Sequence, residues 1–134
     1  MGFYGIPFES QLLIYQFDSL TGATDGDWHF DTFYPEMKAL LLLQDVDERS
    51  GPTAYLRGTH RLHAFRLRHE FFGYRKHRKL RFFSPADLSP WLEREVFLCG
   101  QAGTLIIFDG RGLHRPTAQQ GSPRSFLMNY LVRA

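Results

Sequence analysis

The stretch that most strongly indicates the fold is MKALLLLQDV, residues 37–46. Its centre is an unbroken run of one Ala and four Leu, which is too short to span a membrane and has the length of a strand covered on both faces. The polar segment DERSGP, residues 47–52, is typical of a turn, and TAYL, residues 53–56, again favours a strand. The sequence therefore predicts a strand, a turn and a second strand here.

Short apolar segments of the same kind occur on both sides of this stretch. We expect further strands over residues 11–17, 28–31, 96–99, 104–108 and 125–132. A helix start is predicted where Ser84 can act as the cap, with Pro85 at the first position and Asp87 at the third. We expect this short helix to continue through Trp91 to about Glu93. Many short strands with little helix favour a β-sandwich or barrel over a parallel α/β sheet.

The composition is that of one globular domain. A chain of 134 residues with 43% hydrophobic and 16% aromatic residues can form a core, which argues against disorder. No apolar stretch is long enough to span a membrane, the start does not look like a signal peptide, and the single Cys99 excludes an internal disulfide. We therefore expect a reducing compartment, the cytoplasm, and a buried Cys99 within the apolar segment VFLC, residues 96–99.

Candidate metal ligands lie in two distant segments, WHFD at residues 28–31 and GLHR at residues 112–115. His29 and Asp31 are two residues apart, so on a strand both side chains point to the same face. If folding brings His114 beside them, two imidazoles and one carboxylate cover one face of a metal ion and leave the other face open. This is the ligand set of non-heme Fe(II) oxygenases. A Cys-rich zinc site is excluded, because the chain has one Cys.

Arg124 lies ten residues after His114, at the start of a predicted strand. A guanidinium near such a metal would bind the carboxylate of a co-substrate through a bidentate pair. The alternative is that His29 and His114 are ordinary polar residues at strand ends and that Arg124 is a surface charge. Four further histidines lack a carboxylate at strand spacing and are not expected to be ligands: His60, His63, His69 and His77.

Four blocks of the sequence resemble, in the correct order, the phytanoyl-CoA dioxygenase family of Fe(II)/2-oxoglutarate oxygenases. WHFD at 28–31 resembles the family's Trp-His-x-Asp motif, and the segment 42–61, which ends in RGTHR, resembles its strand–turn–strand with a Pro-Gly-Ser-His-like turn. GTLIIFDGR at 103–111 leads into His114 as in the family's second metal motif, and Arg124 stands where the family places its arginine for 2-oxoglutarate. The resemblance covers about residues 11–134 and implies a mostly β, cupin-like double-stranded β-helix, or jelly roll.

The resemblance implies an Fe(II)- and 2-oxoglutarate-dependent dioxygenase that uses O2 to hydroxylate a small-molecule substrate, with release of succinate and CO2. The implied metal ligands are His29, Asp31 and His114. Arg124 would bind the distal carboxylate of 2-oxoglutarate, and Tyr15 and Thr117 are further candidates for contacts to this co-substrate. Asp31 also argues against the related halogenases, which lack this carboxylate.

The chain departs from the family in length. Family members usually carry an N-terminal region that packs on the major sheet, whereas here little sequence precedes the strand before His29. We therefore expect a single oxygenase domain over residues 1–134 that is N-terminally truncated, or a minimal or homo-oligomeric member. The competing hypothesis is a non-catalytic or degenerate metal-binding jelly roll without a complete substrate pocket. A cupin enzyme independent of 2-oxoglutarate would usually show a His-x-His pair, which this sequence lacks.

A basic segment, residues 57–81, contains nine Lys or Arg and one acid, Glu70. Together with the helix start at Ser84, it predicts a short, basic and partly helical insertion around residues 61–93. The insertion is either a solvated loop over the barrel mouth or a lid that attracts an anionic substrate. The run KHRK at 76–79 resembles a nucleic-acid-binding patch, but base-stacking residues and further arginines in the last strand are not evident, which argues against a nucleic-acid partner.

Overall fold

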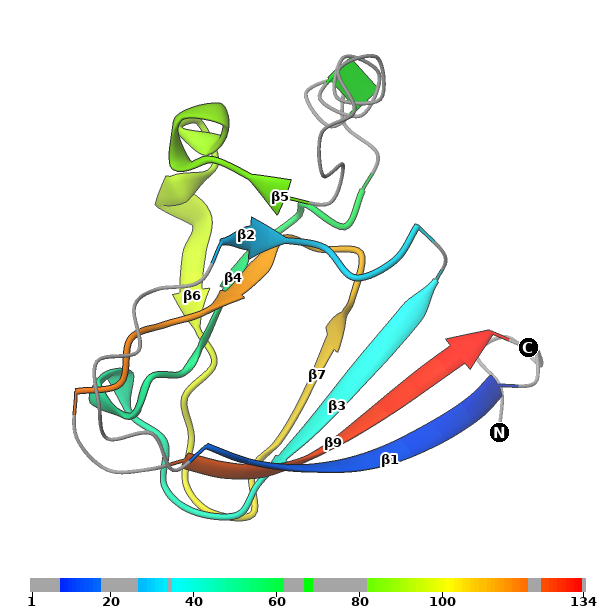
Figure 1. Ribbon diagram of the computed structural model, residues 1–134, viewed down its shortest axis with the longest axis vertical. Coiled ribbons are helices and arrows are strands. Elements are labelled where there is room, and N and C mark those ends of the chain that lie inside the picture. Colours follow the sequence, from blue (N-terminus) through cyan, green and yellow to red (C-terminus); the bar gives the residue numbers. More distant parts are fainter. Residues whose placement is uncertain are drawn as a thin grey trace.

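The computed structural model shows two antiparallel β-sheets that face each other (Figure 1). It describes residues 8–17, 27–33, 35–61, 67–68, 82–120 and 124–133. For residues 8–17 and 124–133 only the backbone is described. The strands are β1 (Phe8–Phe17), β2 (Trp28–His29), β3 (Glu36–Leu42), β4 (Thr53–Leu56), β5 (Phe82–Phe83), β6 (Glu95–Phe97), β7 (Leu105–Asp109), β8 (His114–Pro116) and β9 (Arg124–Arg133). The 3-10 helices are η2 (Glu48–Ser50), η3 (Pro85–Leu88) and η4 (Leu92–Arg94).

The strand order identifies a jelly roll. One sheet has the order β1-β9-β3-β7 and the other has the order β5-β2-β8-β4-β6, and all paired strands are antiparallel. From β1 to β4, and again from β6 to β9, consecutive strands belong alternately to the two sheets. The predicted all-β, double-stranded β-helix fold is therefore confirmed.

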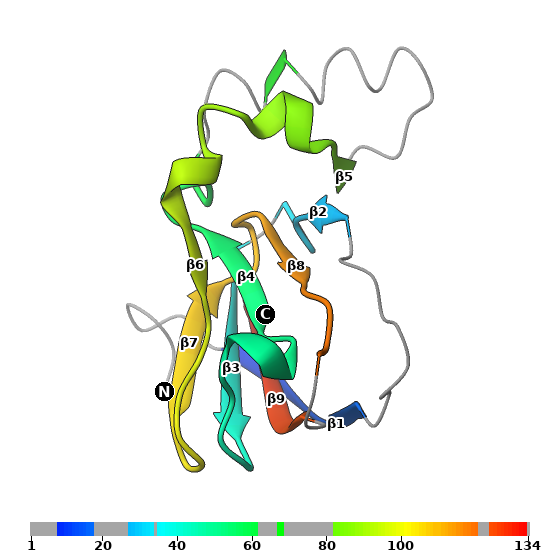
Figure 2. The same ribbon diagram turned by 90° about the vertical axis from the view of Figure 1, so that its left-hand side faces the viewer.

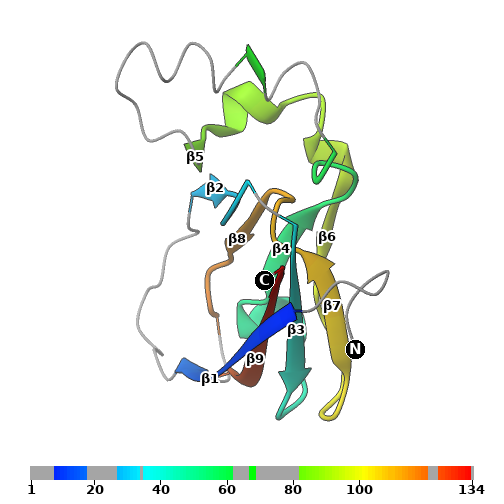
Figure 3. The same cartoon turned by 90° about the vertical axis from the view of Figure 1, so that its right-hand side faces the viewer.

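Two hydrophobic cores lie on the two faces of β4. Ala54 and Leu56 join Trp28 and other residues in a fully apolar cluster beneath η3 and η4, whereas Tyr55 belongs to a second cluster between the sheets. Because neighbouring residues of a strand point to opposite faces, this short strand separates the two cores. Figures 2 and 3 show the segment from β5 to η4 beside β2 and β6, where it covers the first cluster.

The strand predicted over residues 37–46 ends earlier, at Leu42, in the structure. The chain bends at Leu43, and the Asp45 carboxylate accepts a hydrogen bond from the backbone N–H of Ala102 at 2.8 Å. Val46 then makes an isolated bridge to Gly100. A polar anchor to the neighbouring turn therefore ends the ladder, although the apolar run continues past Leu42 in the sequence.

The predicted helix start at Ser84 is confirmed, but the helix that follows is shorter than expected. The Ser84 hydroxyl accepts a hydrogen bond from the backbone N–H of Asp87, and the Asp87 carboxylate accepts one from the backbone N–H of Ser84. This capping box starts η3, which ends at Leu88, and a second 3-10 turn, η4, follows after Trp91. Within the described residues no helix is long and apolar enough to cross a membrane. Most of the predicted basic insertion, residues 62–66 and 69–81, lies outside the described residues.

The prediction that Cys99 is buried is wrong. Val96 and Leu98 pack against the core between the sheets, while Phe97 and Cys99 are exposed. The cause is the two-residue alternation of an extended chain, which turns every second side chain of this apolar segment outward. Partial burial and two nearby carboxylates raise the pKa of the Cys99 thiol, so the reactive thiolate is disfavoured.

Candidate metal centre

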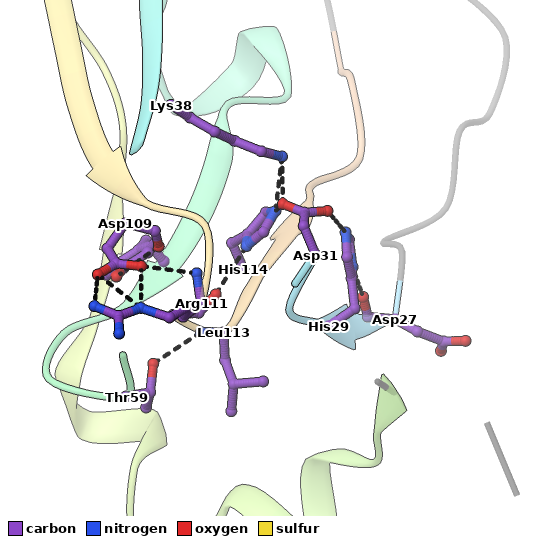
Figure 4. A network of polar contacts seen from close by, with 11 residues as sticks. Asp27, His29, Asp31, Lys38, Thr59, Asp109, Arg111, Leu113 and His114 are labelled. Atoms are coloured by element: carbon purple, nitrogen blue, oxygen red, sulfur yellow. Dashed lines mark hydrogen bonds and ion pairs between the residues drawn. The ribbon is translucent and has the colours of Figure 1, made fainter. Parts of the chain in front are cut away.

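Strand β2 and the two residues after it alternate between packing residues and polar residues. Trp28 and Phe30 are 3% and 1% exposed and belong to the cluster beneath η3. His29 lies between them and therefore points to the opposite face, toward the space between the sheets (Figure 4). Asp31 comes two residues after His29, and its backbone N–H donates a hydrogen bond to the carbonyl of Gly110 at 3.0 Å. Residues packed on one face thus fix the direction of His29 on the other.

His114 begins β8 and pairs with His29 across the sheet. Before it, the Asp109 carboxylate accepts hydrogen bonds from the backbone N–H and the guanidinium of Arg111, which shapes the tight turn. The buried Thr59 hydroxyl donates to the Leu56 carbonyl at 2.7 Å and accepts from the backbone N–H of Leu113 at 2.8 Å. The Gly-Thr-His turn therefore anchors the residue before His114, which gives this motif a structural role.

The structure brings the three predicted ligands together. Nε2 of His114 lies 3.1 Å from Oδ2 of Asp31, and Nε2 of His29 lies 3.9 Å from Oδ1 of the same carboxylate. One possible ligand atom from each residue lies within 4.8 Å of the others. Asp31 therefore stands between two imidazoles that come from neighbouring strands.

Backbone carbonyls orient both imidazole rings. Nδ1 of His29 lies 2.8 Å from the carbonyl oxygen of Asp27, and Nδ1 of His114 lies 2.9 Å from that of Gly112. A carbonyl oxygen only accepts hydrogen bonds, so Nδ1 carries the proton in each ring. The lone pair of Nε2 is then directed at Asp31 and is free to bind a cation. This is the tautomer that a metal ligand requires.

Lys38 also reaches the candidate metal site, although it was not predicted as a site residue from the sequence. It is 5% exposed, and its ammonium forms an ion pair with Oδ2 of Asp31 and lies 3.5 Å from Nε2 of His114 (Figure 4). A signal was present in the sequence, because Lys38 shares the inward face of β3 with Leu40 and Leu42. A lysine on a buried strand face requires a buried acceptor or counter-charge.

The electrostatics of the site favour a charged Asp31 and a neutral His29. Burial by itself would raise the pKa of Asp31, but its close contacts with the His114 ring and with the Lys38 ammonium hold it well below its usual range. Burial lowers the pKa of His29 below the ordinary 6.5, more than the carbonyl of Asp27 raises it. An anionic carboxylate between imidazole lone pairs is the protonation state that binds a divalent cation.

Glu36 forms the rim of this site. A Cβ at Gly110 would lie 2.7 Å from Oε1 of Glu36 and 3.6 Å from Oδ2 of Asp31, so a side chain there would require Glu36 to shift from its place beside Asp31. The Gly110 N–H also donates to the Glu36 carbonyl at 2.8 Å. Burial, and then the negative charge of Asp31, raise the pKa of Glu36. Two carboxylates thus approach each other across a glycine.

Of the remaining predicted site residues, the structure describes the side chain of Thr117 and only the backbone of Tyr15 and Arg124. Arg124 opens β9 opposite Phe17 of β1, and the register gives positions 124 and 15 the same sheet face as position 38. The side chains of Tyr15 and Arg124 lie outside the described part of the chain. The Thr117 hydroxyl donates to the carbonyl of Pro52 at 2.6 Å, so it anchors the turn after η2, while its oxygen can still accept a hydrogen bond.

Comparison with known proteins extends these observations. No protein-family model matches the chain, and no protein of curated function matches it. Among solved structures, AviO1 from Streptomyces viridochromogenes Tue57 is similar, with a TM-score of 0.64 and 16% identity over 94% of this chain and 51% of AviO1. HygX from Streptomyces hygroscopicus, a structure with nickel and 2-oxoglutarate bound, has a TM-score of 0.59 and 14% identity over 96% of this chain and 57% of HygX.

EvdO2 from Micromonospora carbonacea var. aurantiaca, in a complex with 2-oxoglutarate, has a TM-score of 0.60 and 17% identity. The match covers 98% of this chain and 53% of EvdO2. The chain therefore spans about half the length of the solved proteins that it matches. At these identities the likeness establishes the fold: the chain has the jelly-roll architecture of proteins that include 2-oxoglutarate-binding members.

Proposed function

We propose that this chain is the Fe(II)- and 2-oxoglutarate-dependent dioxygenase domain of a phytanoyl-CoA dioxygenase-type protein. It would hydroxylate a small-molecule substrate and release succinate and CO2. One observation carries the proposal: two imidazoles with Nε2 lone pairs and one carboxylate converge within 4.8 Å inside a jelly roll. The likeness of the fold to HygX and EvdO2, which bind 2-oxoglutarate in their solved structures, supports it.

The residues fit a divalent, iron-type metal. His29 and His114 offer two nitrogen donors and Asp31 offers oxygen, which is the donor set of non-heme Fe(II) oxygenases. The ion pair between Asp31 and Lys38 supports this fit, because the ligand atoms already attract a cation. When bound, the iron would activate O2, with 2-oxoglutarate as the two-electron reductant, and the protein would supply positioning and exclusion of water.

The roles of the other residues follow from their chemistry. Arg124 would bind the distal carboxylate of 2-oxoglutarate through a planar, bidentate guanidinium pair. Tyr15 and Thr117 would donate or accept hydrogen bonds to the same co-substrate. The positive charge of the basic segment 57–81 would attract an anionic substrate.

The proposal is tested by anaerobic titration of the protein with Fe(II) and then 2-oxoglutarate. We expect a weak visible charge-transfer band of the 2-oxoglutarate chelate. The band should be lost in His29→Ala, weakened in Arg124→Ala, and retained in His60→Ala, which removes a histidine outside the three-residue site. A folded protein that binds metal without the band would instead be a metal-binding jelly roll without oxygenase function. A folded protein that binds no divalent metal would overturn the proposal entirely.

A further inference from the structure

The ammonium of Lys38 lies where the ligand atoms of the site converge. It contacts Oδ2 of Asp31 in an ion pair, and Nε2 of His114 lies 3.5 Å away (Figure 4). Because Nδ1 of His114 donates to the carbonyl of Gly112, Nε2 carries a lone pair and accepts from the ammonium. The Lys38 ammonium therefore contacts the lone pairs of two of the three ligand atoms that a metal would need.

A metal ion and this ammonium cannot use the same lone pairs together. A bond between a metal ion and an imidazole nitrogen is about 2.1 Å long. A metal ion bound to Nε2 of His114 would therefore leave no room there for a hydrogen of the Lys38 ammonium. Two cations at that separation also repel each other strongly in a partly desolvated site. The backbone of Lys38 is fixed in β3 between β7 and β9, so only its side chain can give way.

Glu36 offers the displaced ammonium a second carboxylate. It is two residues before Lys38 on β3, so both residues belong to the same sheet face. Its Oε1 is buried and has no hydrogen-bond partner among the residues that the structure describes. The missing side chain at Gly110 leaves the space beside this oxygen open toward Asp31.

We propose that Lys38 is an internal counter-cation of the metal centre, which a divalent metal displaces from Asp31 and His114 and which then pairs with Glu36. The proposal rests on the proposed metal-binding function and adds a role that the three ligands do not contain. In the metal-free protein Lys38 neutralises the partly buried Asp31 carboxylate and holds the ligand set together. When metal binds, Lys38 exchanges one carboxylate for another.

The first test is the affinity for Mn(II), measured as the decrease of the free-ion EPR signal in the full chain without co-substrate. Lys38→Met removes the competing charge and keeps the side-chain length, so we expect the dissociation constant to fall about tenfold or more, within the range of ordinary coupling energies. Lys38→Gln is the second neutral variant and should shift the constant in the same direction. Arg49→Met removes one exposed positive charge in η2 and should leave the affinity unchanged.

The second test is a double-mutant cycle with Glu36. Glu36→Gln removes the carboxylate that receives the ammonium, so metal affinity should fall about tenfold when Lys38 is present. In the Lys38→Met background the same change should have little effect. An equal loss in both backgrounds would mean that Glu36 attracts the metal directly, and it would overturn the exchange.

The two proposals fail in different ways. If wild type binds Mn(II) and both neutral Lys38 variants, checked for folding by thermal unfolding, bind it equally well, the role of Lys38 is wrong and the metal site stands. If neither the wild type nor any variant binds metal, the proposed function itself is wrong. Tighter binding in the Lys38 variants together with a Glu36 effect confined to the Lys38 background supports the exchange.

Discussion

The space between the two sheets has an apolar part and a polar part, and both are built from the inner face of β3. Leu40 and Leu42 are 4% and 3% exposed and pack with Tyr55 and Phe108. Lys38, on the same face and equally buried, meets Asp31 instead. The Phe108 ring lies at the boundary, with its centroid 5.5 Å from that of Tyr55 and 5.4 Å from that of His114.

The difference shows how one strand serves both stability and chemistry. Apolar side chains need only shape complementarity, since the hydrophobic effect has no direction. The buried ammonium needs a specific acceptor at a specific place, because an unpaired buried charge is very unfavourable. The apolar part therefore stabilises the barrel, and the polar part depends on the register that brings Asp31 and His114 to Lys38.

The largest effect on stability is expected in the apolar part. Leu40→Ala should lower the free energy of unfolding by about 3 kcal/mol, because it removes buried methyl groups and leaves a cavity. Urea unfolding of the metal-free protein measures this. Leu43→Ala, at a side chain that is 46% exposed, is the matched control and should change stability by less than about 0.5 kcal/mol. Similar losses in the two variants would contradict the assignment of this core.

The polar part should respond through charge. Asp31→Asn leaves the Lys38 ammonium without its carboxylate, and the expected loss is about 2 kcal/mol, because water reaches part of this pair. The Asp31 side chain is 28% exposed, which is why the loss is smaller than for a fully buried pair. The double variant Asp31→Asn with Lys38→Met should recover part of this loss in chemical unfolding. If the stability losses of the two single variants simply added in the double variant, the ion pair would contribute no coupling free energy to folding.

A smaller effect is expected at Thr59, whose hydroxyl bonds the residue before His114. Thr59→Val keeps the shape but leaves the buried N–H of Leu113 without its acceptor, so stability should fall by about 1.5 kcal/mol. Thr59→Ser keeps the hydroxyl and should lose less in thermal unfolding. Because Leu113 precedes His114, the Val variant should also weaken Mn(II) binding. Equal metal affinity in the Val and Ser variants would mean that this hydrogen bond does not position His114.

The smallest effect is a pH dependence that only the polar part should show. Burial lowers the pKa of His29 below 6.5, so the unfolded chain binds a proton more readily than the folded protein does. Stability of the metal-free protein should therefore decrease as the pH falls below about 6.5. The lowered pKa of Asp31 adds a further decrease below about pH 4, since the folded state favours the carboxylate.

Denaturant unfolding at several pH values in the presence of a chelator measures these slopes. His29→Gln should flatten the dependence near pH 6, while Leu40→Ala should lower the whole curve without changing its shape. A wild-type stability that is constant between pH 7 and pH 5 would contradict the burial of a neutral His29.

Much of the site could be predicted because the ligands follow local rules. The spacing of His29 and Asp31 places them on one strand face, and the packing of Trp28 and Phe30 on the other face follows from the same alternation. His114 was a candidate ligand from its own segment, and the family resemblance supported it. The fine structure was predicted less well: the short strands β5 and β8, the early end of β3 at Leu42 and the exposure of Cys99 were not expected.

By itself, the sequence determined the class of fold, most of the longer strand-forming segments and the types of candidate ligand, because periodicity, turn residues and side-chain chemistry are properties of short segments. The tertiary structure alone decided that His114 lies beside His29, that both rings present Nε2, and that Lys38 enters the ligand set. These relations join residues up to 85 positions apart, between His29 and His114. They depend on strand register and sheet pairing, which no local pattern specifies.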